Sequence, residues 1–220
     1  MSNLSPYCCV PLLLEIDAVS KRCRATVALT SVTALVTVGL TCGPQVRETQ
    51  PSDLRKRQWA QRLELKGVSN FHKVSGRLYR GAQPTAEGMR GLRELGIKTV
   101  VNLRTFHSDR DEIGDTPLGY EHVHMQAWDG DVEDIVWFLR IAADERRTPV
   151  FVHCQYGADR TGVACAAYRV VVEGWPKEEA IDEMVNGGFG FKKIWGNLID
   201  LIRDLDAESI REQLDAGEKR

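Results

Sequence analysis

The chain has 220 residues, of which 43% are hydrophobic and 27% are charged, and its formal net charge at pH 7 is −2. This length allows one domain with a substantial core plus an appendage, and the composition is that of a soluble globular domain. The near-neutral charge, with no long basic run, argues against a protein that binds nucleic acid.

Residues 1–43 are interpreted as a signal peptide or as a membrane or lipid anchor. Residues 25–41 carry no charge and follow Lys21, Arg22 and Arg24, which is the order of an export signal. The run is short for a transmembrane helix, which needs about 20 residues. Cys42 follows it directly and resembles the lipid-attachment cysteine of bacterial lipoproteins. We expect an exported, periplasmic or membrane-anchored protein rather than a cytoplasmic one; a buried helix of the domain is the alternative.

Three further segments follow. Residues 44–70 show little periodicity and are interpreted as a linker, residues 71–206 as the folded domain, and residues 207–220 as a charged C-terminal tail. The first half of the domain predicts a strand at residues 77–79, a helix opened by Pro84 that runs to Leu95, a stop at Gly96, and a β-branched strand at residues 98–103.

The second half continues the alternation of strands and helices. We expect an exposed loop at 105–119, strands at 120–127 and 150–153, helices at 131–143, 161–172, 176–186 and 191–205, and a glycine-rich turn at 187–190. This order predicts an α/β fold with a mostly parallel central sheet flanked by helices. Ligands bind such sheets at the carboxyl ends of the strands.

Cys154 stands at such an end. A short loop with Gly157 follows it, then Arg160, then a run compatible with a helix. A loop that enters a helix N-terminus directs backbone N–H groups and a positive dipole at one small space, which suits a phosphate. The same environment stabilises a thiolate, and the guanidinium of Arg160 can hold two phosphate oxygens. The predicted phosphate-binding residues are Gln155, Tyr156, Gly157, Ala158, Asp159 and Arg160.

The run His153-Cys154-x5-Arg160-Thr161-Gly162 resembles the signature loop of cysteine-dependent phosphatases and is most similar to the dual-specificity branch. Segments 78–84 and 98–104 also resemble exported bacterial members of this group. The resemblance implies a dual-specificity phosphatase-like fold over residues 71 to about 205 and a protein phosphatase that works through a phosphocysteine. It implies no metal and no cofactor, and as partner a phosphorylated protein or a small phosphate ester.

The resemblance also implies roles for the residues of the motif. Cys154 is the nucleophile, and Arg160 with the loop amides stabilises the transferring phosphoryl group. Thr161 donates a hydrogen bond to the cysteine sulfur and helps it leave. His153 orients the backbone of Cys154 and tunes its pKa.

The proton for the leaving oxygen is expected from an aspartate beyond the strand at 120–127. Asp129 is the first candidate, because the residue just past the strand end can overhang the pocket. Asp131 is the second and is also suited to cap the next helix; Asp134 is the third and is expected to face solvent. Asp159 either opposes highly charged substrates from the rim of the pocket or points away and pairs with a basic neighbour.

Other chemistry-bearing residues have simpler interpretations. His122 and His124 share one face of a strand, where ordinary packing is favoured over a metal pair, and Arg80 and Arg104 are expected to be structural. Cys165 is expected to pack in a helix. The alternatives for function are an inositol-phosphate phosphatase, a pseudophosphatase that binds phospho-ligands without turnover, and a thiol redox enzyme such as a C-x5-R arsenate reductase.

Overall fold

The fold was determined as a computed structural model that describes residues 57–126, 128 and 130–218. The chain divides into two units, Met1–Asp53 and Leu54–Arg220, and the described residues all belong to the second. The predicted signal or anchor at 1–43, with Cys42, therefore lies outside the described part. No helix within that part is long and apolar enough to cross a membrane.

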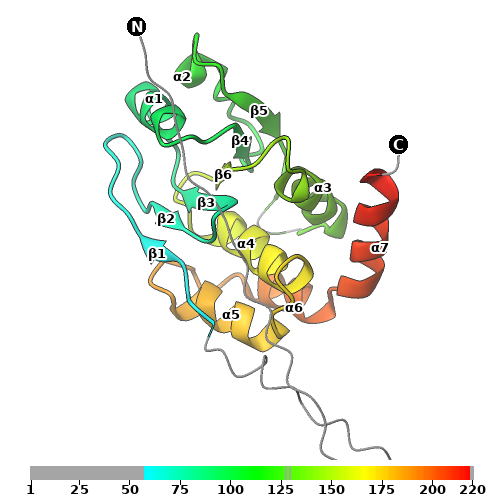
Figure 1. The fold of residues 1–220 in the computed structure, drawn as a ribbon. Coiled ribbons are helices and arrows are strands. Elements are labelled where there is room, and N and C mark those ends of the chain that lie inside the picture. Colours follow the sequence, from blue (N-terminus) through cyan, green and yellow to red (C-terminus); the bar gives the residue numbers. More distant parts are fainter. Residues whose placement is uncertain (1–56, 127, 129, 219–220) are drawn as a thin grey trace, which may run out of the picture. The chain divides into compact units, whose positions relative to one another are not determined.

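The centre of the fold is a six-stranded sheet in the order β1-β2-β3-β6-β4-β5 (Figure 1). Strands β3 (Leu78–Gly81), β6 (Val150–His153), β4 (Thr99–Asn102) and β5 (Gly119–His122) are parallel, whereas β1 (Gln61–Arg62) and β2 (His72–Lys73) extend the sheet antiparallel. The predicted parallel part is confirmed. The antiparallel edge is missing from the prediction because each of its strands has only two residues.

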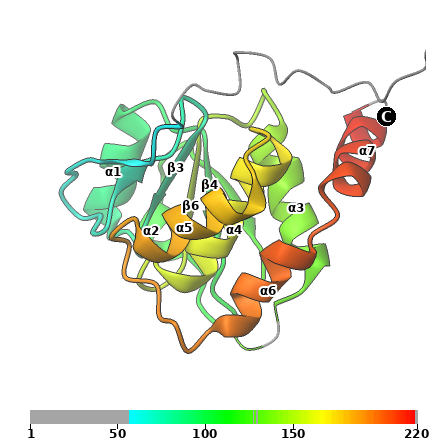
Figure 2. The ribbon, with the colours of Figure 1, turned by 90° about the horizontal axis from the view of Figure 1, so that it is seen from below.

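Helices cover both faces of the sheet (Figure 2). One core contains residues of α1 (Ala86–Glu94) and α2 (Arg110–Ile113) with Val100 and Phe151 of the strands. The other contains residues from α3 (Val132–Ala143), α4 (Asp159–Val171), α5 (Lys177–Asn186), α6 (Gly196–Asp204) and α7 (Ala207–Glu218), together with the strand residues Val101 and Val152. Side chains alternate across a strand, so neighbours such as Val100 and Val101 enter different cores.

Helix α4 is the central helix of the second core. Every residue from Thr161 to Val171 is buried, and the helix contacts α3, α5, α6 and α7. A helix that is buried on all sides needs such neighbours, and its one buried charge within this stretch, Arg169, is paired with Glu173 and Glu183. Among the described helices, α4 has the most buried residues, and the phosphate-binding loop leads directly into it, which gives the loop a rigid base.

The linker prediction is wrong for residues 57–70. Val68 is buried in the core beside α1, and Leu63 and Leu65 pack against it. The amide of Leu63 also donates to the carbonyl of Phe71 (2.9 Å). These apolar residues are isolated in an otherwise polar segment, so the sequence showed no periodicity. In the structure they pack against the core beside the edge strands of the sheet. Residues 44–56 of the predicted linker lie outside the described part.

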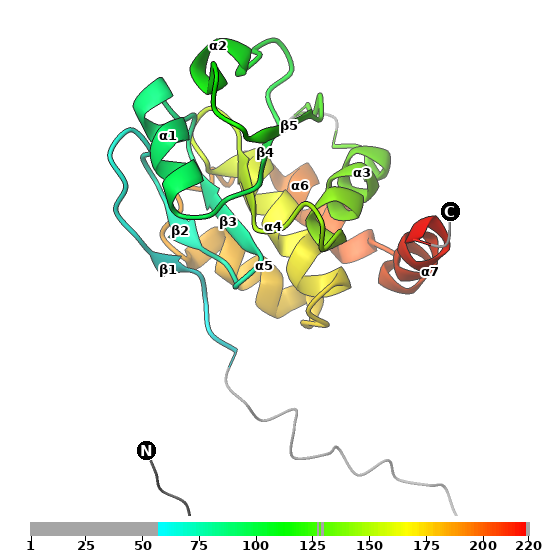
Figure 3. The same cartoon turned by 45° about the horizontal axis from the view of Figure 1, so that its top comes forward.

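The predicted C-terminal tail at 207–220 is instead a helix over Ala207–Glu218, which lies beside α3 (Figure 3). Ile210 is buried and Leu214 packs against the same core, and this i,i+4 pair gives the helix an apolar stripe. Arg211 donates to the carbonyls of Val170 and Val171, both at 2.7 Å. Charged residues surround this apolar pair, so the sequence analysis did not recognise the amphipathic helix.

Three smaller boundaries also differ. The expected loop at 105–119 contains α2 and the buried residues Asp109, Ile113 and Leu118. Strand β5 ends at His122 rather than 127, because its partner β4 ends at Asn102. The last predicted helix begins at Gly196 instead of 191. The helix expected at 131–143 is confirmed as α3, and the one to Leu95 as α1, with Thr85 as its N-cap.

Candidate active site

The loop that follows β6 lies against the end of β3. Strand β6 ends at His153 and α4 begins at Asp159, so Cys154 to Ala158 form the connection at the carboxyl edge of the parallel strands. Gly157 has a φ of +66°, and a Cβ there would lie 2.3 Å from the carbonyl carbon and oxygen of Gly81. Only glycine combines this backbone conformation with so close an approach. The position of Gly157 therefore fixes the curvature of the loop.

The loop carbonyls are held from one side. The side-chain amide of Asn70 donates to the carbonyls of Tyr156 (3.0 Å) and Gly157 (3.3 Å), and Arg80 donates to those of Gly157 (2.7 Å) and Ala158 (3.4 Å). In a trans peptide the next N–H points opposite to the carbonyl. The amides that follow these carbonyls thus point away from Asn70 and Arg80 and are available to an anion.

Arg80 is confirmed as structural, although it binds the loop rather than a strand end. It is almost fully buried, and its guanidinium lies 3.9 Å from the ring centroid of Phe189. The sequence analysis missed Asn70, which also donates to the Phe189 carbonyl (2.9 Å) and has a φ of +52°. Asparagine tolerates this region better than most residues, which was the available signal.

Cys154 is 3% exposed at the base of the loop. Burial by itself raises the pKa of its thiol. Hydrogen bonds from the side chain and amide of Thr161, the charge of Arg160 and the amide of Tyr156 outweigh burial, and the net pKa is lowered. The hydroxyl of Thr161 is buried and has no nitrogen or oxygen partner among the described residues, so it is available to the sulfur.

Arg160 is partly buried. Its guanidinium donates to the carbonyls of Leu103 (3.2 Å) and Met125 (3.4 Å), beyond the ends of β4 and β5. No ion pair with a described carboxylate neutralises it. The structure therefore brings Cys154, Arg160 and Thr161 together around the loop, as the sequence predicts.

His153 is fully buried behind the loop and is bound to a residue that the sequence analysis missed. Its Nε2 lies 2.7 Å from Oδ2 of Asp109, which is itself fully buried, and its Nδ1 lies 3.3 Å from the carbonyl oxygen of Cys154. Asp109 stands in a segment that we expected to be an exposed loop. A single aspartate among Asp, Gly and His residues gives no periodic signal.

The remaining loop residues differ in exposure. Gln155 and Tyr156 are exposed, whereas Ala158 is buried. Asp159 accepts a hydrogen bond from the backbone amide of Lys192 (2.8 Å), and the Lys192 ammonium lies 5.3 Å from the centroid of the Tyr156 ring. Asp159 therefore turns toward the segment before α6, as in the second of its two interpretations, but its partner is a backbone amide.

The structure separates the three candidate acids. Asp129 lies outside the described residues. Asp131 caps α3, and its carboxylate accepts from the amide of Glu133 (2.9 Å). Asp134 is half-buried, so it is less exposed than expected but still reaches solvent; burial first, and the charge of Asp131 second, raise its pKa.

His122 and His124 stack on each other with ring centroids 4.0 Å apart. Each has a carbonyl partner: Nε2 of His122 lies 2.5 Å from the oxygen of Arg104, and Nδ1 of His124 lies 2.9 Å from that of Thr105. Packing thus accounts for both rings. Cys165 is buried in α4, and burial raises its pKa to about 11, which suits packing rather than chemistry.

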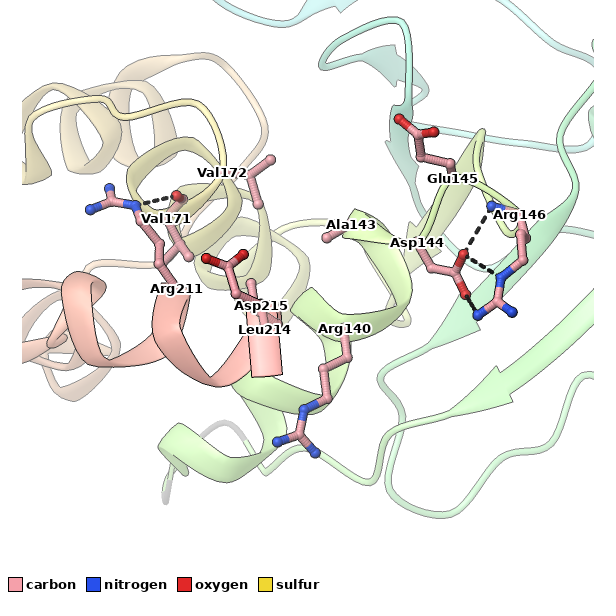
Figure 4. A pocket seen from close by; sticks show the side chains of 10 residues that line it. All are labelled: Arg140, Ala143, Asp144, Glu145, Arg146, Val171, Val172, Arg211, Leu214 and Asp215. Atoms are coloured by element: carbon pink, nitrogen blue, oxygen red, sulfur yellow. Dashed lines mark hydrogen bonds and ion pairs between the residues drawn. The ribbon is translucent and has the colours of Figure 1, made fainter. Parts of the chain in front are cut away.

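A cavity of about 700 Å³ is lined by side chains from α3, the C-terminal end of α4 and α7 (Figure 4), and therefore lies at the opposite end of α4 from the loop. It is bounded by Val171 and Val172 at that end, by the C-terminal part of α3 and by Arg211, Leu214 and Asp215 of α7. Some of the charged residues that line the cavity form ion pairs with each other, such as Asp144 with Arg146 (3.1 Å). Helix α4 has thirteen residues and is therefore about 20 Å long, and it lies between the cavity and the loop, so the cavity takes no part in chemistry at the thiol.

Comparisons with known proteins identify the family of the chain. A family model described as a DSP-PTPase phosphatase fused to NAD+ kinase matches residues 60–195. The dual specificity protein phosphatase TpbA of Pseudomonas aeruginosa is 33% identical over 177 residues, which is 80% of each chain.

Solved structures show the same fold. The crystal structure of P. aeruginosa TpbA superposes with a TM-score of 0.64 at 34% identity, over 73% of this chain and 99% of that one. The catalytic core of the PP-IP phosphatase Siw14 from S. cerevisiae has a TM-score of 0.63 at 22% identity, over 70% and 96% of the two chains. The extent of the family match and the identity to TpbA show that the chain belongs to the dual-specificity protein phosphatases.

Proposed function

We propose that this protein hydrolyses phosphate monoesters, phosphotyrosine above all, through a phosphocysteine intermediate on Cys154. The observation that carries the proposal is a buried thiol of lowered pKa at the base of an amide-lined loop, beside an arginine with no anionic partner in the described structure. A solved structure of P. aeruginosa TpbA is a complex with phosphotyrosine, at 33% identity to this chain.

The reaction has two steps. The Cys154 thiolate attacks phosphorus, the P–S bond forms, and the bond to the leaving oxygen breaks as that oxygen takes a proton from Asp129. A water molecule then attacks the phosphocysteine and gives a proton to the Asp129 carboxylate. The P–S bond breaks, and the thiolate that returns is stabilised by the hydroxyl of Thr161.

Charge stabilisation comes from groups that are already in place. The guanidinium of Arg160 and the loop amides hold the equatorial phosphoryl oxygens. These donors are already oriented before charge develops, so the reaction needs little reorganisation. Rigidity supports this role, because Asn70 and Arg80 hold the carbonyls of the loop and Gly157 presses against β3. His153 acts from behind through the backbone of Cys154.

An inositol-phosphate substrate is the second candidate, and Arg104 favours it. The Arg104 guanidinium lies 3.5 Å from the Gln155 side-chain oxygen and forms no ion pair with a described residue, so a second anionic group beside the loop would find a cation there. Asp159 does not oppose such a substrate, because its carboxylate is bonded to the backbone amide of Lys192. Phosphotyrosine needs only one phosphate site and is therefore preferred.

The purified protein should release phosphate from a phosphotyrosyl peptide at a rate that EDTA does not change. Iodoacetate should stop the reaction by alkylating Cys154, whose pKa is lowered, well before Cys165, whose pKa is raised. The measurement is phosphate release from a panel of phosphotyrosyl, phosphoseryl and inositol phosphates, with alkylation mapped by mass spectrometry. Loss of activity on chelation that zinc or magnesium restores would contradict a metal-free mechanism.

We also propose that the chain is exported. The support is the basic group Lys21, Arg22 and Arg24 ahead of the charge-free residues 25–41. The native protein should therefore be shortened or lipidated at or near Cys42, which intact-mass measurement of the protein isolated from its source cells will show. A soluble cytoplasmic form that retains residues 25–41 would refute the proposal.

A further inference from the structure

Asp109 occupies the centre of a hydrogen-bond network behind the phosphate-binding loop. Its Oδ2 is 2.7 Å from Nε2 of His153, and its Oδ1 accepts from the side-chain amides of Gln83 (2.9 Å) and Asn102 (3.0 Å). Its backbone N–H donates to the hydroxyl of Tyr120 (3.1 Å). Asp109 precedes α2, but its side chain forms no capping bond to that helix. A fully buried carboxylate is costly unless it is fully bonded, and these partners are what offset that cost for Asp109.

The first arm of the network leads to the nucleophile. His153 faces an acceptor at each ring nitrogen: the Asp109 carboxylate at Nε2 and the Cys154 carbonyl at Nδ1 (3.3 Å). An imidazole donates from both nitrogens only when both are protonated. Two proton arrangements satisfy both contacts: a doubly protonated ring against the Asp109 carboxylate, or a neutral ring that donates from Nδ1 and accepts at Nε2 from a protonated Asp109. The first arrangement places a positive ring next to the backbone of Cys154, and it is the one that the nitrogen NMR spectrum described below tests.

The second arm leads to the rim of the loop. The amide nitrogen of Gln83 faces Asp109, so its oxygen faces Arg104 and accepts from the guanidinium (3.1 Å). The amide of Asn102 is oriented in the same way, and its oxygen accepts from the backbone N–H of Arg104 (2.8 Å). Because a carboxylate only accepts and an arginine only donates, Asp109 fixes the orientation of both amides. The guanidinium of Arg104 then reaches the side chain of Gln155.

We propose that Asp109 is a positioning residue of the phosphate site, which holds His153 doubly protonated behind Cys154 and, through Gln83 and Asn102, holds Arg104 beside the loop. The inference rests on the proposed function for its role in turnover. The state of the thiol, however, can be measured without any substrate.

Other charged groups lie near Asp109 and His153, and the experiment must distinguish their effects from those of this pair. His107 has its Nε2 3.7 Å from Oδ1 of Asp109 and 3.4 Å from Oε1 of Glu112. Together these three side chains could also hold a metal ion, although Oδ1 of Asp109 already accepts two amide hydrogens. The remaining neighbours are the guanidinium of Arg104, the phenol of Tyr120 and the guanidinium of Arg160 on the far side of Cys154.

The test is Asp109→Asn, measured by the rate at which iodoacetamide alkylates Cys154 as a function of pH, with the Cys154 peptide followed by mass spectrometry. Without the carboxylate the buried ring loses its counter-ion and becomes neutral, so the thiolate loses a nearby positive charge and the Cys154 pKa rises. We expect the alkylation profile to move to higher pH by about one unit, which makes alkylation roughly tenfold slower below the pKa. The acidic limb of kcat/KM should move in the same direction.

His107→Gln is the matched control, because it removes the neighbouring titratable ring and leaves Asp109 and His153 in contact. It should leave the alkylation profile in place, with and without EDTA. A profile that does not move in Asp109→Asn, or moves to lower pH, while the thermal unfolding curve shows a folded protein, overturns the proposal. A merely structural role would lower Tm and leave the profile where it was.

A second measurement on the unmodified protein guards against a variant that does not fold. In a nitrogen NMR spectrum at pH 7, both ring nitrogens of His153 should have the chemical shifts of protonated nitrogens, with the assignment made by their loss in His153→Gln. The chain has five histidines, so the signals are few. One unprotonated nitrogen at His153 overturns the proposal. If no phosphate ester is turned over, the proposed function fails, while alkylation and NMR still decide the role of Asp109.

Discussion

Cys154→Ser should lose turnover by roughly 10³-fold or more and still bind a phosphotyrosyl peptide. The serine hydroxyl is not ionised near neutral pH, so the nucleophile is lost. The anion site consists of loop amides and Arg160 and does not depend on the sulfur. The measurement pairs steady-state phosphate release with calorimetric titration of the peptide.

Two variants make this result specific. Cys165→Ala removes the other described cysteine, which is buried in α4, and should keep turnover near the original rate. Adding Arg160→Ala to Cys154→Ser should abolish the binding that the single variant retains. Turnover within a factor of ten of the unmodified protein in Cys154→Ser would exclude the cysteine mechanism.

The sequence was sufficient for the central part of the fold because its signals are local there. A β-branched run ends at Cys154, glycine marks the tight turn, and apolar residues fill α4, so the strand, loop and helix could all be read in one short stretch. The same holds for α3, where the capping aspartate and the apolar face coincide. Each of these features depends on neighbours within about one helical turn or one strand.

What the sequence did not predict depends on contacts between distant segments. Asn70 and Arg80 bind the loop from 86 and 77 residues away, and Asp109 reaches His153 across 44 residues. The two-residue strands β1 and β2 and the helix α7 are likewise stabilised by partners far along the chain. A buried polar residue looks the same in the sequence as an exposed one until its partner is known.

These long-range residues share one function: they hold the loop without approaching its anion site. Asn70 and Arg80 bind carbonyls, Gly157 contacts Gly81, and Asp109 acts through His153. A preorganised anion site stabilises a transition state because it needs no reorganisation during the reaction. Rigidity of the loop is therefore part of the proposed chemistry.

Asp129→Asn should lower kcat by about 10²–10⁴-fold with a poor leaving group such as an alkyl phosphate, because general acid catalysis contributes about that much. With an aryl phosphate, whose leaving oxygen needs little protonation, the loss should be much smaller. The comparison of the two substrates measures proton donation directly. It also separates a missing acid from a damaged loop, which would slow both substrates alike.

The pH profile gives an independent check. The acidic limb of kcat/KM reports formation of the Cys154 thiolate, whose pKa is lowered by groups that the substitution does not touch, so it should stay in place. The basic limb reports deprotonation of the acid and should flatten in Asp129→Asn.

Asp131→Asn and Asp134→Asn are the matched controls for the acid. Asp131 is engaged as the cap of α3, and asparagine caps as well as aspartate, so this variant should retain activity with both substrates. Asp134 is half-buried and burial raises its pKa, a property that a general acid also needs, which makes it the sharper competitor. If the dependence on the leaving group follows Asp134 or Asp131 instead of Asp129, the acid belongs to the first turn of α3 or to its cap. If none of the three variants shows that dependence, the proton comes from a residue outside this segment.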